Sequence, residues 1–237
     1  MNRDVASPRL AVSVSEPLPR TLLTLTFVTG IVDATSFLAL GQVLVAMQTG
    51  NVIFLGLGIG DAAGAPVVAP LVSLGSFLAA GAVAVVLGRR LASSSARALA
   101  IAMALEVALL GSAAVAATVI TVTPDDVSAY SLIALLAIAM GLRNTVARQI
   151  GNPNIASTVL NLTVAGFTAH SPLSLAGSED LAQRGAALLA ILLGALTGAL
   201  LVKTSLALAI ATGAAVSLAA GLTYLSGTAR PSSSAPR

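Results

Sequence analysis

Asp33 is the residue whose type and position point most directly to chemistry. It lies in a long apolar stretch, Gly30–Gly60, close to the hydroxyl residues Thr29, Thr35 and Ser36. A carboxylate inside an apolar membrane segment is costly, so such a residue commonly marks a proton or cation site. The alternative is a structural carboxylate that accepts hydrogen bonds from the neighbouring hydroxyls.

Two helix-breaking sites follow this carboxylate, at Gly41-Gln42 and at Gln48-Thr49-Gly50-Asn51. Their polar residues predict a non-helical, partly water-accessible region over Gly41–Asn51, because lipid offers no hydrogen-bond partners. Thr49 or Asn51 would cap the helix that follows, and Gly50 would admit a backbone or a ligand closely. A helix start at mid-depth would favour an anionic or carbonyl-bearing solute through its positive dipole end. The alternative is an ordinary capped turn.

A second acidic residue, Glu106, lies well inside the apolar segment Ala98–Thr118. This position suggests a role in transport or coupling. The structural alternatives are a protonated, hydrogen-bonded core residue and an ion pair with Arg143. Arg143 itself and Arg148 are interpreted as cationic anchors at a cytoplasmic helix end.

The composition is that of a membrane protein. Of the 237 residues, 57% are hydrophobic and 9% are charged, and the mean hydropathy is +0.97; soluble domains carry about 25% charged residues. The chain has no cysteine and a single histidine, His170, which excludes thiol chemistry and a multi-histidine metal centre. We therefore expect no metal and no cofactor. The basic residues flank apolar segments, so they are interpreted as topology signals and not as a nucleic-acid surface.

The spacing of apolar residues predicts an all-α integral membrane protein, with six transmembrane helices and two shorter re-entrant or half-helical segments. The expected crossings are Leu22–Leu40, Val67–Leu87, Ala98–Thr118, Ser131–Leu142 with an extension toward Gln149, Gly185–Val202 and Ser205–Leu225. The short segments are Val52–Ile59 and Ile155–Thr168. One membrane domain would span residues 21–226, between disordered tails at 1–20 and 227–237.

The distribution of Lys and Arg separates this topology from the alternative of eight crossings. Eight crossings would divide the twelve basic residues equally between the two sides of the membrane. Six crossings with both termini inside would place all of them except Lys203 on the cytoplasmic side. Because positive charge is enriched on that side, we expect six crossings in the cell (inner) membrane with cytoplasmic termini.

The two halves of the domain, about 21–120 and 128–226, show the same order of features. Gly30 and Asp33 match Gly141 and Asn144, and Thr49-Gly50-Asn51 matches Ser157-Thr158. Three crossings in each half would invert the halves relative to each other. Inverted repeats with interrupted helices at matching positions are typical of transporter binding sites. Asn144 and Thr158 therefore join Asp33, Thr49, Gly50, Asn51 and Glu106 as candidate solute- or ion-binding residues.

Three segments carry a family resemblance: GIVDATSFLALG at 30–41, MQTGNVIFLGL at 47–57 and GLRN at 141–144. They resemble the YoaK-like family of bacterial multi-pass membrane proteins, over essentially the whole span Leu22–Leu225. The resemblance implies an integral inner-membrane protein of about this size. It implies no particular substrate or reaction, so the functional interpretation depends on the residues.

The residues favour a secondary transporter or permeation protein for a small solute, which could be anionic and proton-coupled. The alternatives are a non-transporting scaffold or accessory subunit and, with least support, a membrane-embedded enzyme. We expect no enzyme, because no metal cluster, nucleophile–base pair or nucleotide loop is recognisable. The expected partners are the lipid bilayer and the solute. Small-residue faces such as Gly194–Gly198 also provide helix-packing surfaces through which a homo-oligomer could form.

The charge distribution yields a direct test of topology. Reporter fusions at Arg97 and at Asp126 should give opposite signals, because one crossing separates these positions in the six-crossing arrangement. Identical signals at the two positions would contradict it.

Overall fold

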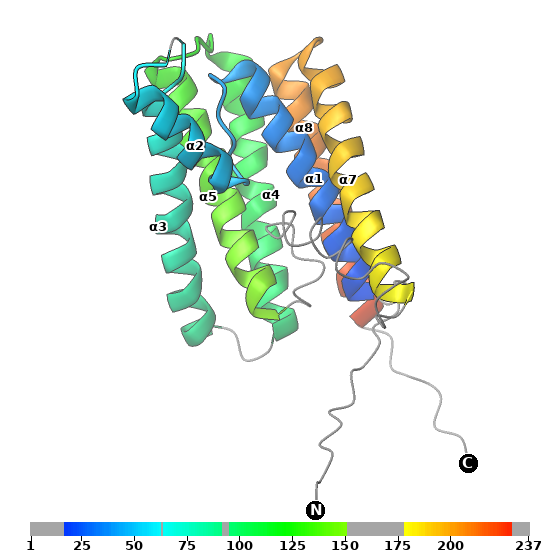
Figure 1. Ribbon diagram of the computed structural model, residues 1–237. Coiled ribbons are helices and arrows are strands. Elements are labelled where there is room, and N and C mark those ends of the chain that lie inside the picture. Colours follow the sequence, from blue (N-terminus) through cyan, green and yellow to red (C-terminus); the bar gives the residue numbers. More distant parts are fainter. Residues whose placement is uncertain (1–16, 63, 92–94, 151–177, 229–237) are drawn as a thin grey trace, which may run out of the picture.

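The computed structural model describes residues 17–62, 64–91, 95–150 and 178–228, and these residues form seven helices and no strand. The helices are α1 (Pro17–Ala39), α2 (Gln48–Ile59), α3 (Val68–Leu91), α4 (Ser95–Val119), α5 (Val127–Ile150), α7 (Ser178–Val202) and α8 (Leu206–Thr228). Six of them, all except α2, are long and apolar enough to cross a membrane. The predicted all-α membrane fold is confirmed, and the six long helices run side by side in Figure 1.

The helix boundaries agree closely with the sequence-based expectation. The spans run from Arg20–Ala39 through Gly185–Val202 to Leu206–Gly227. One difference lies at the start, where α1 begins at Pro17 and so includes four residues assigned to the tail. Proline suits the first turn of a helix, because its missing N–H would have no partner there.

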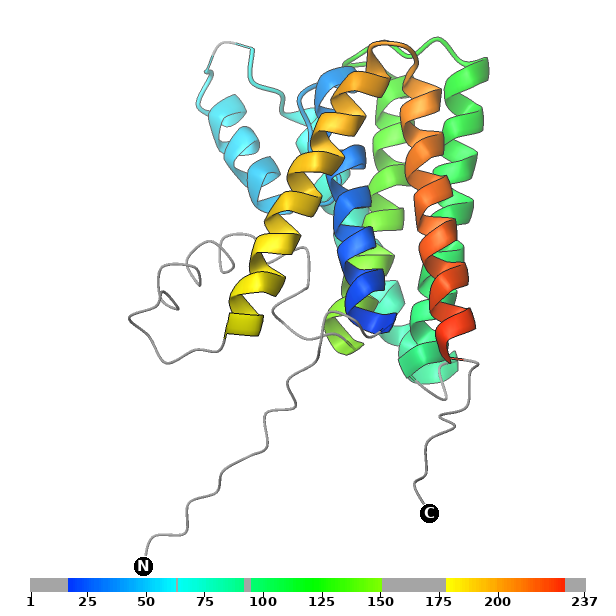
Figure 2. The same cartoon turned by 90° about the vertical axis from the view of Figure 1, so that its right-hand side faces the viewer.

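The first predicted half-helical segment is confirmed, with a shifted boundary. The chain leaves α1, turns back into the bundle over residues 40–47, and then forms α2, which returns toward the same end (Figures 1 and 2). Gly41 (φ 110°) and Gln42 (φ 55°) adopt left-handed conformations at the reversal. The helix already begins at Gln48, so the last four residues of the predicted Gly41–Asn51 break are helical.

Helix α2 is not a membrane crossing. Its 12 residues extend about 18 Å at 1.5 Å per residue, whereas the hydrocarbon core is about 30 Å thick. The second predicted half-helical segment, Ile155–Thr168, lies outside the described residues.

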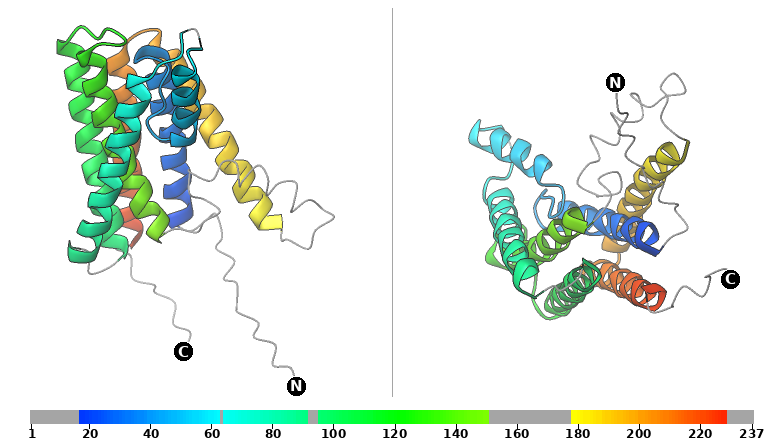
Figure 3. Two further views of the ribbon diagram at one scale, coloured as in Figure 1. Left: turned by 60° about the vertical axis from the view of Figure 1, so that its left-hand side comes forward. Right: turned by 90° about the horizontal axis from the view of Figure 1, so that it is seen from below.

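The bundle has two ends, which we call proximal and distal. The proximal end carries the starts of α1 and α4 and the ends of α3 and α8; the distal end carries the reversal after α1 and the α4–α5 and α7–α8 turns (Figure 1). Helices α1 and α5 are the most buried, with 61% and 67% of their spans enclosed by other protein groups. Helix α1 packs on α7 and α8, α5 packs on α3 and α4, and α4 packs on α8. Viewed from the proximal end, α3 lies at one end of this central pair, α4 and α8 lie along one side of it, and α7 lies beside α1 (Figure 3).

Glycines bring two helix pairs into backbone contact. A Cβ on Gly30 of α1 would collide with the main chain of Ile191 in α7, and one on Gly194 with the carbonyl of Phe27. On the other side, a Cβ on Gly141 of α5 would lie 2.5 Å from the carbonyl oxygen of Phe77 in α3. Small residues permit such close approach in membranes. The small-residue face around Gly194 is therefore covered by α1 within the chain.

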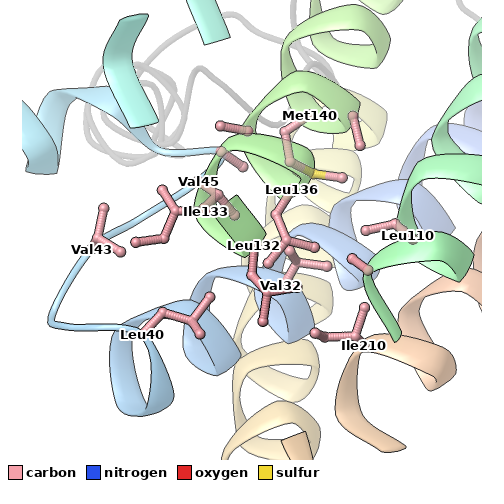
Figure 4. Packing of buried hydrophobic residues seen from close by; sticks show 14 of the residues in the cluster. Val32, Leu40, Val43, Val45, Leu110, Leu132, Ile133, Leu136, Met140 and Ile210 are labelled. Carbon is pink, nitrogen blue, oxygen red and sulfur yellow. The ribbon is translucent and has the colours of Figure 1, made fainter. Parts of the chain in front are cut away.

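The largest apolar cluster lies toward the distal end, between the two central helices. Val43 and Val45 of the reversed segment pack there with Val32 of α1 and Ile133 of α5 (Figure 4). Leu110 of α4 and Ile210 of α8 extend the same cluster (Figure 4). The reversed segment is thus part of the core and not a surface loop.

We predict that Gly194→Ala destabilises the protein. The added methyl group meets the main chain of α1, and overpacking of this kind costs about 1–3 kcal/mol. Gly111→Ala in α4 is the matched control, because nothing lies within 4 Å of the Cβ position. Thermal unfolding of the purified variants in detergent provides the measurement. Equal midpoints for the two variants would contradict the packing.

Candidate functional site

Asp33 anchors the reversed segment to α1. Its Oδ1 accepts hydrogen bonds from the main-chain N–H groups of Val45 and Ala46, each at 2.8 Å. One turn further along α1, the Ser36 hydroxyl donates to the carbonyl oxygen of Val43 at 2.8 Å. Both side chains are buried. Asp33 therefore supplies the acceptor that two main-chain donors would lack in an apolar environment.

Asn51 of α2 also pairs main-chain groups of the reversed segment. Its Oδ1 accepts from the N–H of Leu44 at 2.9 Å, and its Nδ2 donates to the Leu44 carbonyl. That carbonyl also accepts from the Ser73 hydroxyl of α3 at 2.7 Å. Gln48 donates to the carbonyl of Val45 at 3.0 Å. Side chains of three helices thus provide the hydrogen bonds that a regular helix would make internally.

The expected helix cap is wrong. Met47 occupies the capping position of α2 and makes no side-chain capping bond. Asn51 bonds to the reversed segment, Thr49 is exposed, and Gly50 lies against the Leu44 side chain. The start of α2 is also close to the carboxylate of Asp33, which binds the two residues before Met47. The carboxyl group of Asp33 therefore occupies the position near the start of α2 where the sequence predicted an anionic solute.

A second polar centre lies at the middle of the bundle. The Arg143 guanidinium of α5 forms an ion pair with Glu106 of α4 at 2.8 Å and donates to the Thr29 hydroxyl of α1 at 2.6 Å. The Ser217 hydroxyl of α8 donates to Glu106 at 3.0 Å. Thr29, Glu106 and Ser217 lie within one residue of the midpoints of their helices. We call these four residues the central network.

Arg143 is not a cytoplasmic anchor. Its side chain is 1% exposed, and Glu106 is fully buried, so the ion-pair alternative for Glu106 is confirmed. Because Arg143 is buried, ten and not eleven basic residues remain to support the predicted cytoplasmic side. A buried arginine is retained because its guanidinium can use several donors at once, here toward two helices. Asn144 lies beside it, with Oδ1 at 3.5 Å from the guanidinium.

The two polar centres share one face of α1. Thr29 and Asp33 are four residues apart, which places them one above the other on the helix. Asp33 and Glu106 have separate hydrogen-bond partners. Asp33 Oδ2 and Glu106 Oε2 are buried and have no hydrogen-bond partner.

Sequence reasoning found some of these residues and missed others. Of the candidate residues, Asp33, Asn51, Glu106 and Asn144 are buried in the structure, and Thr158 and His170 lie outside the described residues. Ser73 and Ser217 were missed, because serine is common in membrane helices. The available signal for Ser217 was its place on the buried face of α8, at helical spacing from Ile210 and Ala214.

The described residues contain no group of three or more His, Cys, Asp or Glu side chains that could hold a metal ion. The polar centres are built instead from carboxylate, guanidinium, amide and hydroxyl groups. Such groups can bind protons, small cations or hydrogen-bonding solutes.

The fold and these centres define a multi-pass α-helical membrane protein with a polar interior. Residues 21–223 match the model of a family described as "Protein of unknown function (DUF1275)", and the chain belongs to this family. It is 35% identical over 149 residues to the UPF0700 transmembrane protein YoaK of Bacillus subtilis (strain 168). The match covers 62% of this chain and 64% of that protein. No solved structure matches the chain.

The role of Asp33 as an acceptor predicts different effects for two substitutions. Asp33→Asn retains an oxygen that can accept from Val45 and Ala46, so folding and membrane insertion should remain intact. Asp33→Leu leaves both N–H groups buried and unpaired, at a cost of about 1–3 kcal/mol each. Thermal unfolding in detergent should separate the two variants clearly. Equal stability of Asp33→Leu and the unsubstituted protein would disprove the anchoring role.

Proposed function

We propose that this protein is a secondary transporter or permeation protein for a small solute, coupled to a proton or a small cation at the Asp33 and Glu106 carboxylates. The observation that carries the proposal is the central network, in which four helices converge on a buried ion pair at mid-depth. Ionisable groups at this depth are rare in membrane proteins and are typical of ion and substrate pathways.

The buried charges do not balance. Among the described residues, the buried Asp, Glu, Lys and Arg side chains are Asp33, Glu106 and Arg143. With all three ionised, the interior carries one uncompensated negative charge, which is costly in a low-dielectric medium. A proton or a small cation would remove that cost. Asp33 Oδ2 and Glu106 Oε2 are the acceptors left for it.

The packing of the helices supports the expected inverted repeat. Exchanging α1 with α5, α3 with α7 and α4 with α8 converts each major helix pair into another major pair: α1–α7 into α5–α3, α4–α5 into α8–α1, and α4–α8 into itself. Gly30 and Gly141, matched in the sequence, make equivalent backbone contacts with α7 and α3. Repeats of this kind favour alternating access around a site at their interface.

The charges favour a cationic or neutral solute over the anionic one expected from the sequence. The carboxyl group of Asp33 binds Val45 and Ala46, shortly before the start of α2, and so lies where an anionic solute would have to bind. Asp61, Asp125 and Asp126 lie at the distal end with one cation, Lys203, among the residues described there. The potential at this entrance attracts positive species.

The same charges support the orientation with cytoplasmic termini in the cell (inner) membrane. Arg20, Arg97 and Arg148 lie at the proximal end, whereas the aspartates of the turns lie at the distal end. The proximal end would then face the cytoplasm.

The test is proton flux into proteoliposomes that enclose a pH-sensitive dye, with protein-free vesicles as background and small amines and neutral solutes as candidate substrates. The unsubstituted protein should show flux that varies with pH, because the carboxylates must bind and release protons. Asp33→Asn should abolish the pH dependence, since its amide does not titrate in this range.

If Asp33→Asn keeps the flux and pH profile of the unsubstituted protein, Asp33 is structural and Glu106→Gln becomes the decisive variant. If the correctly folded protein supports no flux with any solute, the transport proposal is wrong. Stable co-purification with another membrane protein would then favour the scaffold or accessory role.

A further inference from the structure

A pocket of about 560 Å³ opens at the distal end of the bundle. The end of α1, the reversal, the α2–α3 connection and the α4–α5 turn enclose it, with Phe37, Gln42, Pro66, Asp125 and Tyr130 among its walls. Its volume lies within the range of small-molecule sites, about 300–1,000 Å³. We propose that this pocket binds a small organic cation, such as an alkylammonium group.

The chemistry of the walls selects for positive charge. Of the described residues that line the pocket, Asp125 is the charged one. Its Oδ1 lies 3.5 Å from the position that a Cβ on Gly41 would occupy, so the carboxylate reaches across to the reversal. The aromatic residues Phe37 and Tyr130 also line the pocket. A carboxylate with aromatic faces is a recognised arrangement for organic cations, which are attracted to the ring faces even when they cannot donate hydrogen bonds.

Four of the residues that line the pocket have a positive φ. Gly41, Gln42, Gly64 and Asp125 line it and have positive φ values of 110°, 55°, 78° and 62°. Gln42 and Asp125 adopt a conformation that is uncommon for residues with a side chain. Asp125 has this backbone conformation and lines the pocket. Its neighbour Asp126 instead accepts a hydrogen bond from Ser128 within the turn, at 3.3 Å.

The pocket lies at the distal end of the helix face that carries Thr29 and Asp33. Thr29, Asp33 and Phe37 follow each other at four-residue intervals, so one helix face leads from the central network to the pocket wall. The apolar cluster interrupts this face: Leu40 and Val43 flank Gly41 and Gln42, and Val32 adjoins Asp33. The inference rests on the proposed function in this respect, because the pocket would be the distal binding step of the same pathway.

The binding claim can be tested on purified protein without any flux. The chain has no cysteine, so Ala65→Cys places a single reactive thiol in the pocket wall. Tetramethylammonium should slow maleimide labelling of this thiol. It should not protect Ala62→Cys, in the same connection but outside the pocket wall. Methanesulfonate, a small anion, should protect neither. Val67→Cys provides a second position in the wall if Ala65→Cys folds poorly.

Neutralising the carboxylate provides the decisive comparison. In the Ala65→Cys background, Asp125→Asn should raise the concentration of tetramethylammonium needed for half-protection about tenfold, because the charge attraction is lost and the cation–π attraction remains. Asp126→Asn is the matched control and should leave it unchanged.

Protection by methanesulfonate, absence of protection by tetramethylammonium in both wall variants, or equal effects of the two Asn variants would overturn the inference. Its failure is distinguishable from that of the proposed function. Protection without flux would leave a cation site in a non-transporting protein, whereas flux without protection would leave a transporter whose pocket does not bind organic cations.

Discussion

The need to pair main-chain polar groups inside an apolar medium governs the first half of this structure. A chain that reverses within the membrane exposes N–H and C=O groups that helices normally satisfy internally. Here the groups of residues 43–46 are bonded by Asp33, Ser36, Asn51, Ser73 and Gln48. These partners come from α1, α2 and α3, so the reversal also determines how those three helices meet. The polar residues of this region are, in the first instance, structural.

The central network imposes a different constraint. Removing one member of a buried ion pair leaves the other uncompensated, at a cost of about 3–5 kcal/mol, so Glu106 and Arg143 depend on each other. Thr29 and Ser217 extend this dependence to α1 and α8. Helix α1 carries both Thr29, which belongs to the central network, and Asp33, which binds the reversed segment. A change in charge at the central network therefore affects the helix to which the reversed segment is bonded. This link follows from the geometry of one helix face.

The sequence predicted the elements better than the partnerships. Uninterrupted apolar segments located the six long helices, because burial of a hydrophobic span depends on length and composition alone. The break at Gly41 was also predictable, since glycine weakens a helix and the polar side chain of Gln42 needs partners that lipid does not supply. The pairing of Arg143 with Glu106 could not be chosen from the sequence over a role as an anchor. An arginine seven residues from a helix end fits an interfacial anchor as well as a buried partner, and only the packing of α4 against α5 decides between them.

The glycine contacts determine which parts of the molecule can slide. At Gly30 and Gly194 the main chains of α1 and α7 touch, and at Gly141 α5 touches α3 in the same way. Main-chain atoms cannot change rotamer to make room, so each pair behaves as one stiff body. At the boundary between α1 and α8, by contrast, a Cβ on Gly213 would lie 3.3 Å and 3.8 Å from methyl groups of Val32 and Val28, and side chains can readjust. A shear of the bundle therefore meets less main-chain resistance where α8 meets α1 than within the α1–α7 or α3–α5 pair.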